Sequence, residues 1–296
     1  MPRQPKNPQP KESGPKPSFP QEKQPAPGKE KQMQPKADHG EQSYAGNNLL
    51  RDKVAIITGA DSGIGRAVAI AYAREGADLV LSFLPEEEDD ARETERWVKD
   101  AGRQAALVAG DVGRKSYCER LVQMATSKFG RLDIVVSNAA FQRTYEDIAD
   151  VPEDEFERTF RTNVFGTFFL SQAAAPVLPK GGSILITCSI QSYEPSESLL
   201  AYAPTKAALA NLTKALAKAL AKKQIRVNGV APGPVWTPLI PSTMPKEKVK
   251  EFGKNTAFER PAQPAELAPI YVFLASENAT YVTAEIYGAT GGRTPY

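Results

Sequence analysis

The stretch VAIITGADSGIG at residues 54–65 decides the fold of this chain. A short β-branched run is followed by a glycine-rich turn that leads directly into a helical pattern. Glycines let the backbone turn tightly and approach a pyrophosphate, whose charge is met by N–H groups at the positive end of the helix. The spacing is G-x-x-x-G-x-G, and such a turn can also be plain strand-to-helix geometry, so its meaning depends on the rest of the chain.

The alternation of strand and helix continues beyond this turn to the C-terminus. Buried central strands are predicted from short apolar runs at residues 54–58, 78–83, 105–109, 133–137, 183–187 and 225–230, with a last short strand at 285–288. Helical patterns lie between them at residues 64–75, 87–101, 116–129, 153–177 and 201–222. This order predicts an α/β fold with a doubly wound, Rossmann-like parallel sheet in a single domain over residues 49–296.

Residues 1–48 have a different composition. They hold ten of the 25 prolines, many Lys and Gln, and only scattered apolar side chains. Such a stretch buries too little apolar surface to offset its ordering entropy, so we expect a disordered, extended tail, with residues 38–48 able to strap onto the domain. Binding of nucleic acid or membrane is an alternative because Lys outnumbers acid there, but the basic residues are dispersed, which favours a solvated tail.

Bulk composition and cysteine usage limit the remaining choices. The net charge is only +2, and nothing in it favours nucleic acid or an anionic membrane. Cys118 and Cys188 are too few for a disulfide framework and lack metal-ligand spacing, so we expect two buried thiols in a reducing compartment. The N-terminus lacks the apolar segment of a signal peptide, and no run of about 18 apolar residues occurs. These features predict a cytoplasmic protein.

The only histidine of the chain, His39, lies in the predicted tail. A Ser-His-Asp triad or a histidine-rich metal site is therefore not expected in the folded part, and we predict no metal site. Proton chemistry must use Tyr, Lys, Asp, Glu or Cys.

A second motif, YAPTK, begins at Tyr202 and ends at Lys206. Residues i and i+4 share one face of a helix, so the Lys206 ammonium can sit near the Tyr202 hydroxyl and favour its phenolate. Ser189 precedes the tyrosine by thirteen residues, at the end of the fifth predicted strand, and can hydrogen-bond a substrate oxygen. A Y-x-x-x-K pair alone is usually a surface pair, but its combination with the glycine-rich turn and a strand-end serine favours catalysis.

Together, T-G-x-x-x-G-I-G, an Asn-Ala pair after the fourth strand, and S…Y-x-x-x-K in this order resemble the short-chain dehydrogenase/reductase family. The resemblance covers about residues 53–292 and is greatest to bacterial members of the general-stress-protein type. It implies that Tyr202 is the general acid or base, that Ser189 holds the carbonyl oxygen, and that Lys206 binds the nicotinamide ribose and lowers the tyrosine pKa. Asn163 would anchor a proton-relay water. The cofactor-binding residues implied by the turn and by the resemblance are Gly59, Ser62, Gly63, Ile64, Gly65, Asp111, Val112, Asn138, Ala139, Ala140, Tyr202, Lys206, Pro232, Gly233, Val235 and Thr237.

Two features bear on the cofactor. The family commonly has Asn-Ala-Gly after the fourth strand, whereas this chain has alanine at position 140, whose methyl group narrows the space there and disfavours a positive φ. An acid about 20 residues beyond the glycines would select NAD and a nearby Arg would select NADP. Phe83 stands there between Ser82 and Leu84, and Asp61 would repel a 2′-phosphate, so NAD is favoured and NADP stays open.

Residues 234–255 interrupt the alternation with four prolines and predict a lid over the site, or else a solvent-facing loop. With residues 141–145 and 191–194 it would form the substrate walls. On the helix from Ala201, small residues such as Ala207 and Ala215 suggest packing against a partner helix, and the resemblance implies a homotetramer built on this helix and the one containing Asn163.

The sequence therefore predicts an enzyme that exchanges a hydride between a nicotinamide cofactor and a carbonyl compound or secondary alcohol. The alternative is a non-catalytic NAD(P)-binding regulator or scaffold that uses the tail as an interaction arm. The physiological substrate is not predicted.

Overall fold

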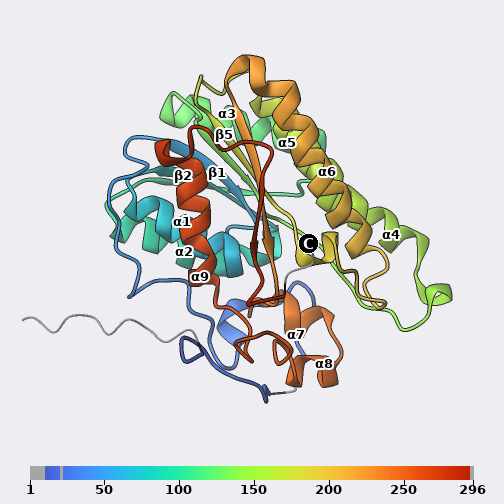
Figure 1. Cartoon of the computed structure of the whole chain (residues 1–296). Coiled ribbons are helices and arrows are strands. Elements are labelled where there is room, and N and C mark those ends of the chain that lie inside the picture. The colour runs from blue at the N-terminus through green and yellow to red at the C-terminus, as the bar shows by residue number, and fades with distance from the viewer. Residues whose placement is uncertain (1–10, 21–22, 294–296) are drawn as a thin grey trace, which may run out of the picture.

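In the computed structural model, residues 11–20 and 23–293 are described, and they form a doubly wound α/β domain (Figure 1). All seven strands are parallel and lie in the order β3-β2-β1-β4-β5-β6-β7. They are β1 (Val54–Thr58), β2 (Asp78–Phe83), β3 (Ala105–Ala109), β4 (Ile134–Ser137), β5 (Ser183–Thr187), β6 (Arg226–Pro232) and β7 (Ile286–Ala289). The order reverses between β1 and β4, and a crevice for ligands is expected at the carboxyl ends of the strands at this point. The predicted fold class is confirmed.

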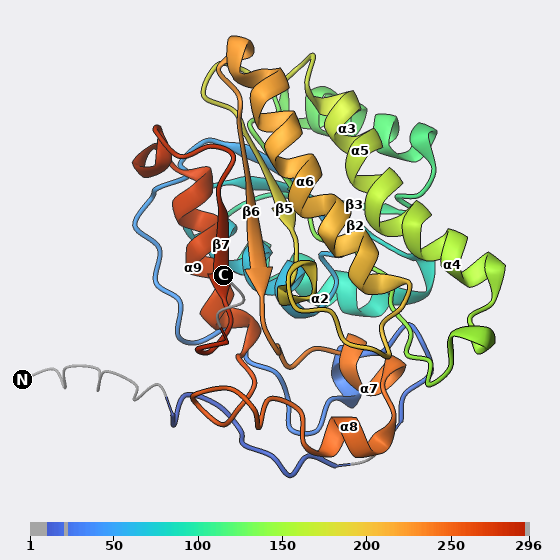
Figure 2. The same cartoon turned by 45° about the vertical axis from the view of Figure 1, so that its right-hand side comes forward.

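Helices cover both faces of the sheet, as Figure 2 shows from the side of α6. One face packs against α1 (Gly63–Arg74), α2 (Glu88–Asp100) and α9 (Pro264–Ala275). The other packs against α3 (Lys115–Phe129), α5 (Gly166–Ala174) and α6 (Tyr202–Leu220). Alternate residues of β1 point to the two faces, so Ile57 joins the first core and Ile56 the second. Cys118 and Cys188 are both buried and free, as expected.

The predicted helix over residues 153–177 is interrupted. It consists of α4 (Glu153–Phe160), a π-helical turn η4 (Arg161–Phe165) and α5. Single π turns inside α-helices occur frequently at functional sites, and this one contains Asn163.

Helix α9 was not predicted from the sequence. Its residues PAELAPIYVFLA are apolar nearly all round, and Pro269 lies inside it, so no 3.6-residue stripe stands out. The signal that was missed is at its start: Pro264 occupies the first turn, and Glu266 accepts a hydrogen bond from the backbone N–H of Gln263 at 2.7 Å in a capping box.

The N-terminal segment has little regular structure, but its described part is packed against the domain. We call residues 11–20 and 23–48 the strap. It contains one short turn, η1 (Glu30–Gln32), and buries Phe19, Met33 and His39 to 3% exposure or less. The expectation of a disordered, extended tail is therefore wrong for these residues, whereas the expected docking of residues 38–48 onto the domain is confirmed. Residues 1–10 of the predicted tail lie outside the described residues.

The apolar anchors of the strap dock beside α7 (Leu239–Thr243) and α8 (Lys246–Lys250), as Figure 1 shows. Phe19 stacks on Trp236 with ring centroids 4.2 Å apart, and its backbone N–H donates to the carbonyl of Lys250. The Trp236 indole N–H donates to the carbonyl oxygen of Pro35 at 2.8 Å. The isolated Phe19 and Met33 were passed over in the sequence because neither lies in a periodic apolar pattern.

Candidate active site

A cavity of about 750 Å³ opens at the carboxyl ends of the strands. Its walls come from α1, from the segments after β4, β5 and β6, and from α7 and α8. Predicted site residues that line it are Ile64, Ser189, Tyr202, Gly233, Val235 and Thr237. Gln142, Gln191 and Glu194, from two of the segments predicted as substrate walls, line it too.

The glycine-rich turn between β1 and α1 needs its glycines for close packing. A Cβ on Gly65 would lie 1.8 Å from the carbonyl oxygen of Gly59, so no side chain fits there. Gly63 has a φ of +50°, and a Cβ there would lie 2.9 Å from Cγ2 of Thr237. The turn thus brings the start of α1 against the loop that follows β6.

Tyr202 and Ser189 face the same cavity. Tyr202 opens α6 and is 9% exposed, while Ser189 follows β5 and is 7% exposed. Burial raises the pKa of the Tyr202 phenol, and a hydrogen bond with Ser189 opposes this increase. A buried hydroxyl held by a second hydroxyl is suited to exchange a proton with a substrate oxygen.

Lys206 lies one helical turn from Tyr202 and is only 2% exposed. Its ammonium lies over the Tyr202 ring, 5.4 Å from the centroid, and donates to the carbonyl oxygen of Thr187 at 2.7 Å. Burial lowers the pKa of Lys206 to about 8. Burial is the largest influence on the pKa of Tyr202 and raises it, and the lowering expected from Lys206 together with an oxidised nicotinamide stays a prediction.

Asn163 is fully buried and joins the loop after β4 to α6. Its Oδ1 accepts from the backbone N–H of Phe141 at 2.8 Å, and its Nδ2 donates to the Phe141 carbonyl and to Oγ1 of Thr205, each at 3.0 Å. Thr205 in turn donates to the Tyr202 carbonyl at 2.6 Å. The side chain therefore fixes the position of the first turn of α6, where Tyr202 lies.

A hydrogen-bond network that the sequence did not reveal lies beneath the site. Asn138 Nδ2 donates to the carbonyls of Thr58 and Gly59 at 3.1 and 3.3 Å, and its Oδ1 accepts from Thr187 at 3.2 Å. The Thr187 hydroxyl also pairs with that of Tyr271 at 2.7 Å. Because Tyr271 belongs to the overlooked helix α9, nothing in the sequence placed it here.

The other predicted cofactor-binding residues lie around the same edge of the sheet. Asp111 and Val112 follow β3, where the Asp111 carboxylate accepts from the Gly113 N–H at 2.8 Å. Ala139 contacts the glycine-rich turn, with its N–H donating to Thr58. Ala140 does not adopt a positive φ, so the alanine there introduces no strain. Pro232 ends β6, and Ser62 is the N-cap of α1.

Acidic groups gather between the glycine-rich turn and the end of β2. Asp61 is 2% exposed, and burial raises its pKa to about 6. Glu87 lies in the short turn η2 (Pro85–Glu87), where burial and then the charge of Asp61 raise its pKa to about 8. The nearby Arg66 donates to the carbonyl of Asp61 at 2.9 Å and to that of Asp90 at 2.9 Å. Its guanidinium is thus turned toward backbone carbonyls within the protein.

The predicted lid is more regular than expected. It contains α7 and α8, and Leu239, Met244 and Phe252 from this region line the cavity. Thr243 ties α7 to the loop after β4, because its Oγ1 accepts from Gln142 at 2.8 Å and its carbonyl accepts from Thr144 at 3.1 Å.

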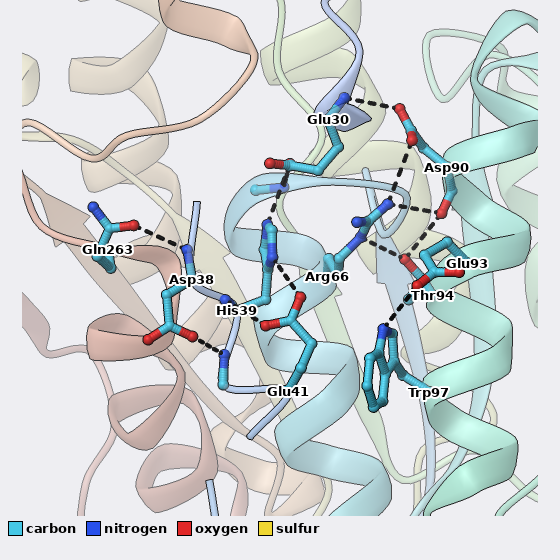
Figure 3. Close-up of polar contacts among 12 residues, drawn as sticks. Glu30, Asp38, His39, Glu41, Arg66, Asp90, Glu93, Thr94, Trp97 and Gln263 are labelled. Atoms are coloured by element: carbon cyan, nitrogen blue, oxygen red, sulfur yellow. Dashed lines mark hydrogen bonds and ion pairs between the residues drawn. The ribbon is translucent and has the colours of Figure 1, made fainter. Parts of the chain in front are cut away.

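A buried ion pair from the strap adjoins the glycine-rich turn (Figure 3). Glu30 accepts from the backbone N–H of Gly63 at 3.0 Å. His39 faces two carboxylates: its Nε2 lies 3.2 Å from Glu30 and its Nδ1 lies 2.9 Å from Glu41. Burial would lower the pKa of His39, but its hydrogen bonds with these carboxylates outweigh that effect and raise it to about 9. No sequence motif marked Glu30.

The described part of the chain shows no grouping of His, Cys, Asp and Glu side chains suited to a metal ion. None of the helices described here has the length and apolarity that crossing a bilayer would need.

Comparison with known proteins gives consistent matches over most of the chain. A family model described as enoyl-(acyl carrier protein) reductase matches residues 59–294. An uncharacterized oxidoreductase of Escherichia coli (strain K12), YghA, is 50% identical over 275 residues, which cover 93% of this chain and 94% of the relative. General stress protein 39 of Bacillus subtilis (strain 168) is 44% identical over 266 residues, with 90% and 93% covered. A solved short chain dehydrogenase from Burkholderia cenocepacia J2315, in complex with NADP, has a TM-score of 0.78 at 27% identity, with 82% and 98% covered.

Proposed function

Because the chain belongs to the short-chain dehydrogenase/reductase family of oxidoreductases, we propose that it exchanges a hydride between a nicotinamide cofactor and a carbonyl compound or secondary alcohol. The single observation that carries this proposal is the placement of Ser189 and Tyr202 on one cavity beside the glycine-rich turn. The bound nicotinamide would supply or accept the hydride.

In this proposal, the residues of the chain handle the proton and hold the reactants. Ser189 donates a hydrogen bond to the substrate oxygen, and Tyr202 gives that oxygen a proton in reduction or removes it in oxidation. Lys206 binds the nicotinamide ribose. Its ammonium, already bonded to the Thr187 carbonyl, has further N–H donors for this contact.

Asn163 acts as a positioning residue in the same proposal. The hydrogen bonds of its side chain go to Phe141 and Thr205, which fits a role in fixing the first turn of α6. We also propose the role that the family resemblance implies for Asn163, which is to anchor a proton-relay water.

We propose NAD as the preferred cofactor. Asp61 supports this choice because a buried carboxylate beside the end of β2 disfavours a 2′-phosphate. Ser82 and Phe83 add no positive charge, and the Arg66 guanidinium is engaged by backbone carbonyls. The competing outcome is a preference for NADP, the cofactor bound in the solved neighbour. Dissociation constants of the purified protein for both cofactors decide between them.

The activity is tested by following nicotinamide absorbance with a panel of aldehydes, ketones and secondary alcohols. Tyr202→Phe should abolish turnover and leave cofactor binding largely intact, because only the proton-transferring hydroxyl is lost. The alternative, a cofactor-binding regulator or scaffold, predicts binding without turnover for any member of the panel.

Assembly and location are also proposals. The side chains that are 41–43% exposed along α4, η4 and α5, and just beyond α5, are Phe156, Phe165, Phe168 and Val177. On α6, Ala207 and Ala215 are exposed. Such a surface supports a homotetramer, which light scattering after size exclusion would test. Two free buried cysteines support a cytoplasmic location, which a fluorescent fusion would test.

A further inference from the structure

The strap contacts the glycine-rich turn through a side chain that is almost fully buried. Glu30 is 6% exposed, and its Oε2 accepts the backbone N–H of Gly63, the first residue of α1. The backbone N–H of Glu30 donates to Oδ2 of Asp90, on α2, at 3.0 Å. The strap therefore links the starts of the two helices that flank the predicted adenosine side of the cofactor site.

The same part of the strap reaches the loop after β6. A Cβ on Gly28 would lie 2.4 Å from the carbonyl oxygen of Pro238, so only glycine allows this approach. Thr237, the preceding residue of that loop, packs against Gly63. The strap, the glycine-rich turn and this loop therefore each contact the other two.

Glu30 bonds to the glycine-rich turn but does not line the cavity. Ile64, next to Gly63, does line it. The carboxylate therefore fixes the first turn of α1 without filling the space in front of it. Because Glu30 leaves that space open, it can support the binding of a ligand at the turn without competing with it.

Glu30 is itself held by charge. His39 lies 3.2 Å from Oε2, and Oε1 is buried without a hydrogen-bond partner. A buried carboxylate with one unsatisfied oxygen is costly unless a cation compensates it, and His39 is the cation that Figure 3 shows against it. The free oxygen leaves Glu30 able to accept one more hydrogen bond at this edge of the site.

We propose that Glu30 is a positioning residue for the cofactor, so that the strap forms part of the cofactor site. It acts through Gly63, whose N–H it engages, and holds the first turn of α1 in the conformation that presents the other amides of this turn to the pyrophosphate. This inference rests on the proposed function. Beyond that function, it assigns a role to an acidic residue that lies 33 residues before Gly63 in the sequence and outside the motifs that define the family resemblance.

The test compares Glu30→Ala and Glu30→Gln with a matched control, Tyr44→Phe. Tyr44 also belongs to the strap, and its hydroxyl donates to Glu75 at 2.6 Å, at the opposite end of α1. The control therefore removes one hydrogen bond of the strap to a carboxylate without touching the glycine-rich turn.

Two measurements are made on the full chain. The first is amide hydrogen exchange over residues 59–66 without cofactor, and the second is the dissociation constant for NAD by calorimetry. Glu30→Ala should speed exchange at the turn and weaken NAD binding about tenfold, as expected for the loss of a hydrogen bond to a charged acceptor. Glu30→Gln, which keeps a carbonyl acceptor, should fall between Glu30→Ala and the parent protein. Tyr44→Phe should leave both quantities unchanged.

The outcomes separate this inference from the proposed function. A parent protein that binds neither NAD nor NADP refutes the proposed function, and with it the role in cofactor binding. A parent protein that binds, together with a Glu30→Ala protein of equal or tighter affinity, overturns the positioning role and leaves the proposed function standing. Equal effects of Glu30→Ala and Tyr44→Phe would overturn it too, because the strap would then act only through general stability.

Discussion

Replacing His39 by glutamine should change how the stability of the protein depends on pH. His39 is 2% exposed, and its two ring nitrogens face the carboxylates of Glu30 and Glu41, so the doubly protonated ring has a negative charge on both sides. Arg66 is the opposing charge, and it acts to lower the pKa of His39. The net effect raises the pKa from 6.5 to about 9.

The sign and size of the effect follow from linkage between protonation and folding. A group whose pKa is raised in the folded state stabilises it fully below the unfolded pKa, and this contribution is lost as pH rises through the folded pKa. For His39 the window runs from about pH 6.5 to about pH 9, and the stabilisation corresponds to about 3 kcal/mol.

The measurement is the free energy of unfolding in urea at several values between pH 6 and 9.5. Glu87 and Lys206 also titrate near pH 8, so the informative quantity is the parent protein minus the His39→Gln variant. That difference should be largest near pH 6 and vanish above about pH 9. Tyr44→Phe serves as control and should give a difference that is flat over this window. Parallel profiles for the parent and His39→Gln proteins would refute the proposed charge on His39.

Three further predictions concern the site and the strap. Alcohol oxidation at saturating cofactor should rise with pH along one titration centred well below ~10, and Lys206→Met should move it upward; an unchanged profile in that variant refutes the coupling to Tyr202. Asp61→Asn should improve the affinity for NADP relative to that for NAD, because the substitution removes a buried acid beside the turn. Dissociation constants that show no relative gain for NADP would contradict this. Phe19→Ala removes a side chain that stacks on Trp236, and truncations of this type destabilise protein cores by about 3–5 kcal/mol, so limited proteolysis should cut the strap faster. An unchanged cleavage rate would argue against the docking of the strap.

Most of the sheet and the helices around it could be predicted from the sequence. Buried parallel strands are continuous apolar runs, and six of the seven predicted strands match the observed ones to within a residue at each end. Helix α9 was missed because a helix buried nearly all round loses the periodicity that reveals amphipathic ones. Its capping box was the available signal.

For the site, the sequence predicted which residues lie together but not how each is partnered. Ser189 and Tyr202 do share a cavity, as their spacing implied. The Lys206 ammonium lies over the ring of Tyr202 and bonds to Thr187, a contact set by the β5 backbone and invisible in a Y-x-x-x-K pattern. Composition likewise failed for the strap, since an average over 48 residues hides single anchors such as Phe19.

Several contacts of the strap can form only after the C-terminal part of the domain has been synthesised. The residues of the strap leave the ribosome before the rest of the domain, yet the Asp38 N–H donates to the side chain of Gln263, 225 residues later, and the Ala265 N–H donates to the Asp38 carbonyl. At synthesis rates of about 5–20 residues per second, the strap waits more than about ten seconds for these partners. In a nascent chain that lacks α9, the two contacts of Asp38 with Gln263 and Ala265 cannot yet form, so the docking of the strap is completed only late in synthesis.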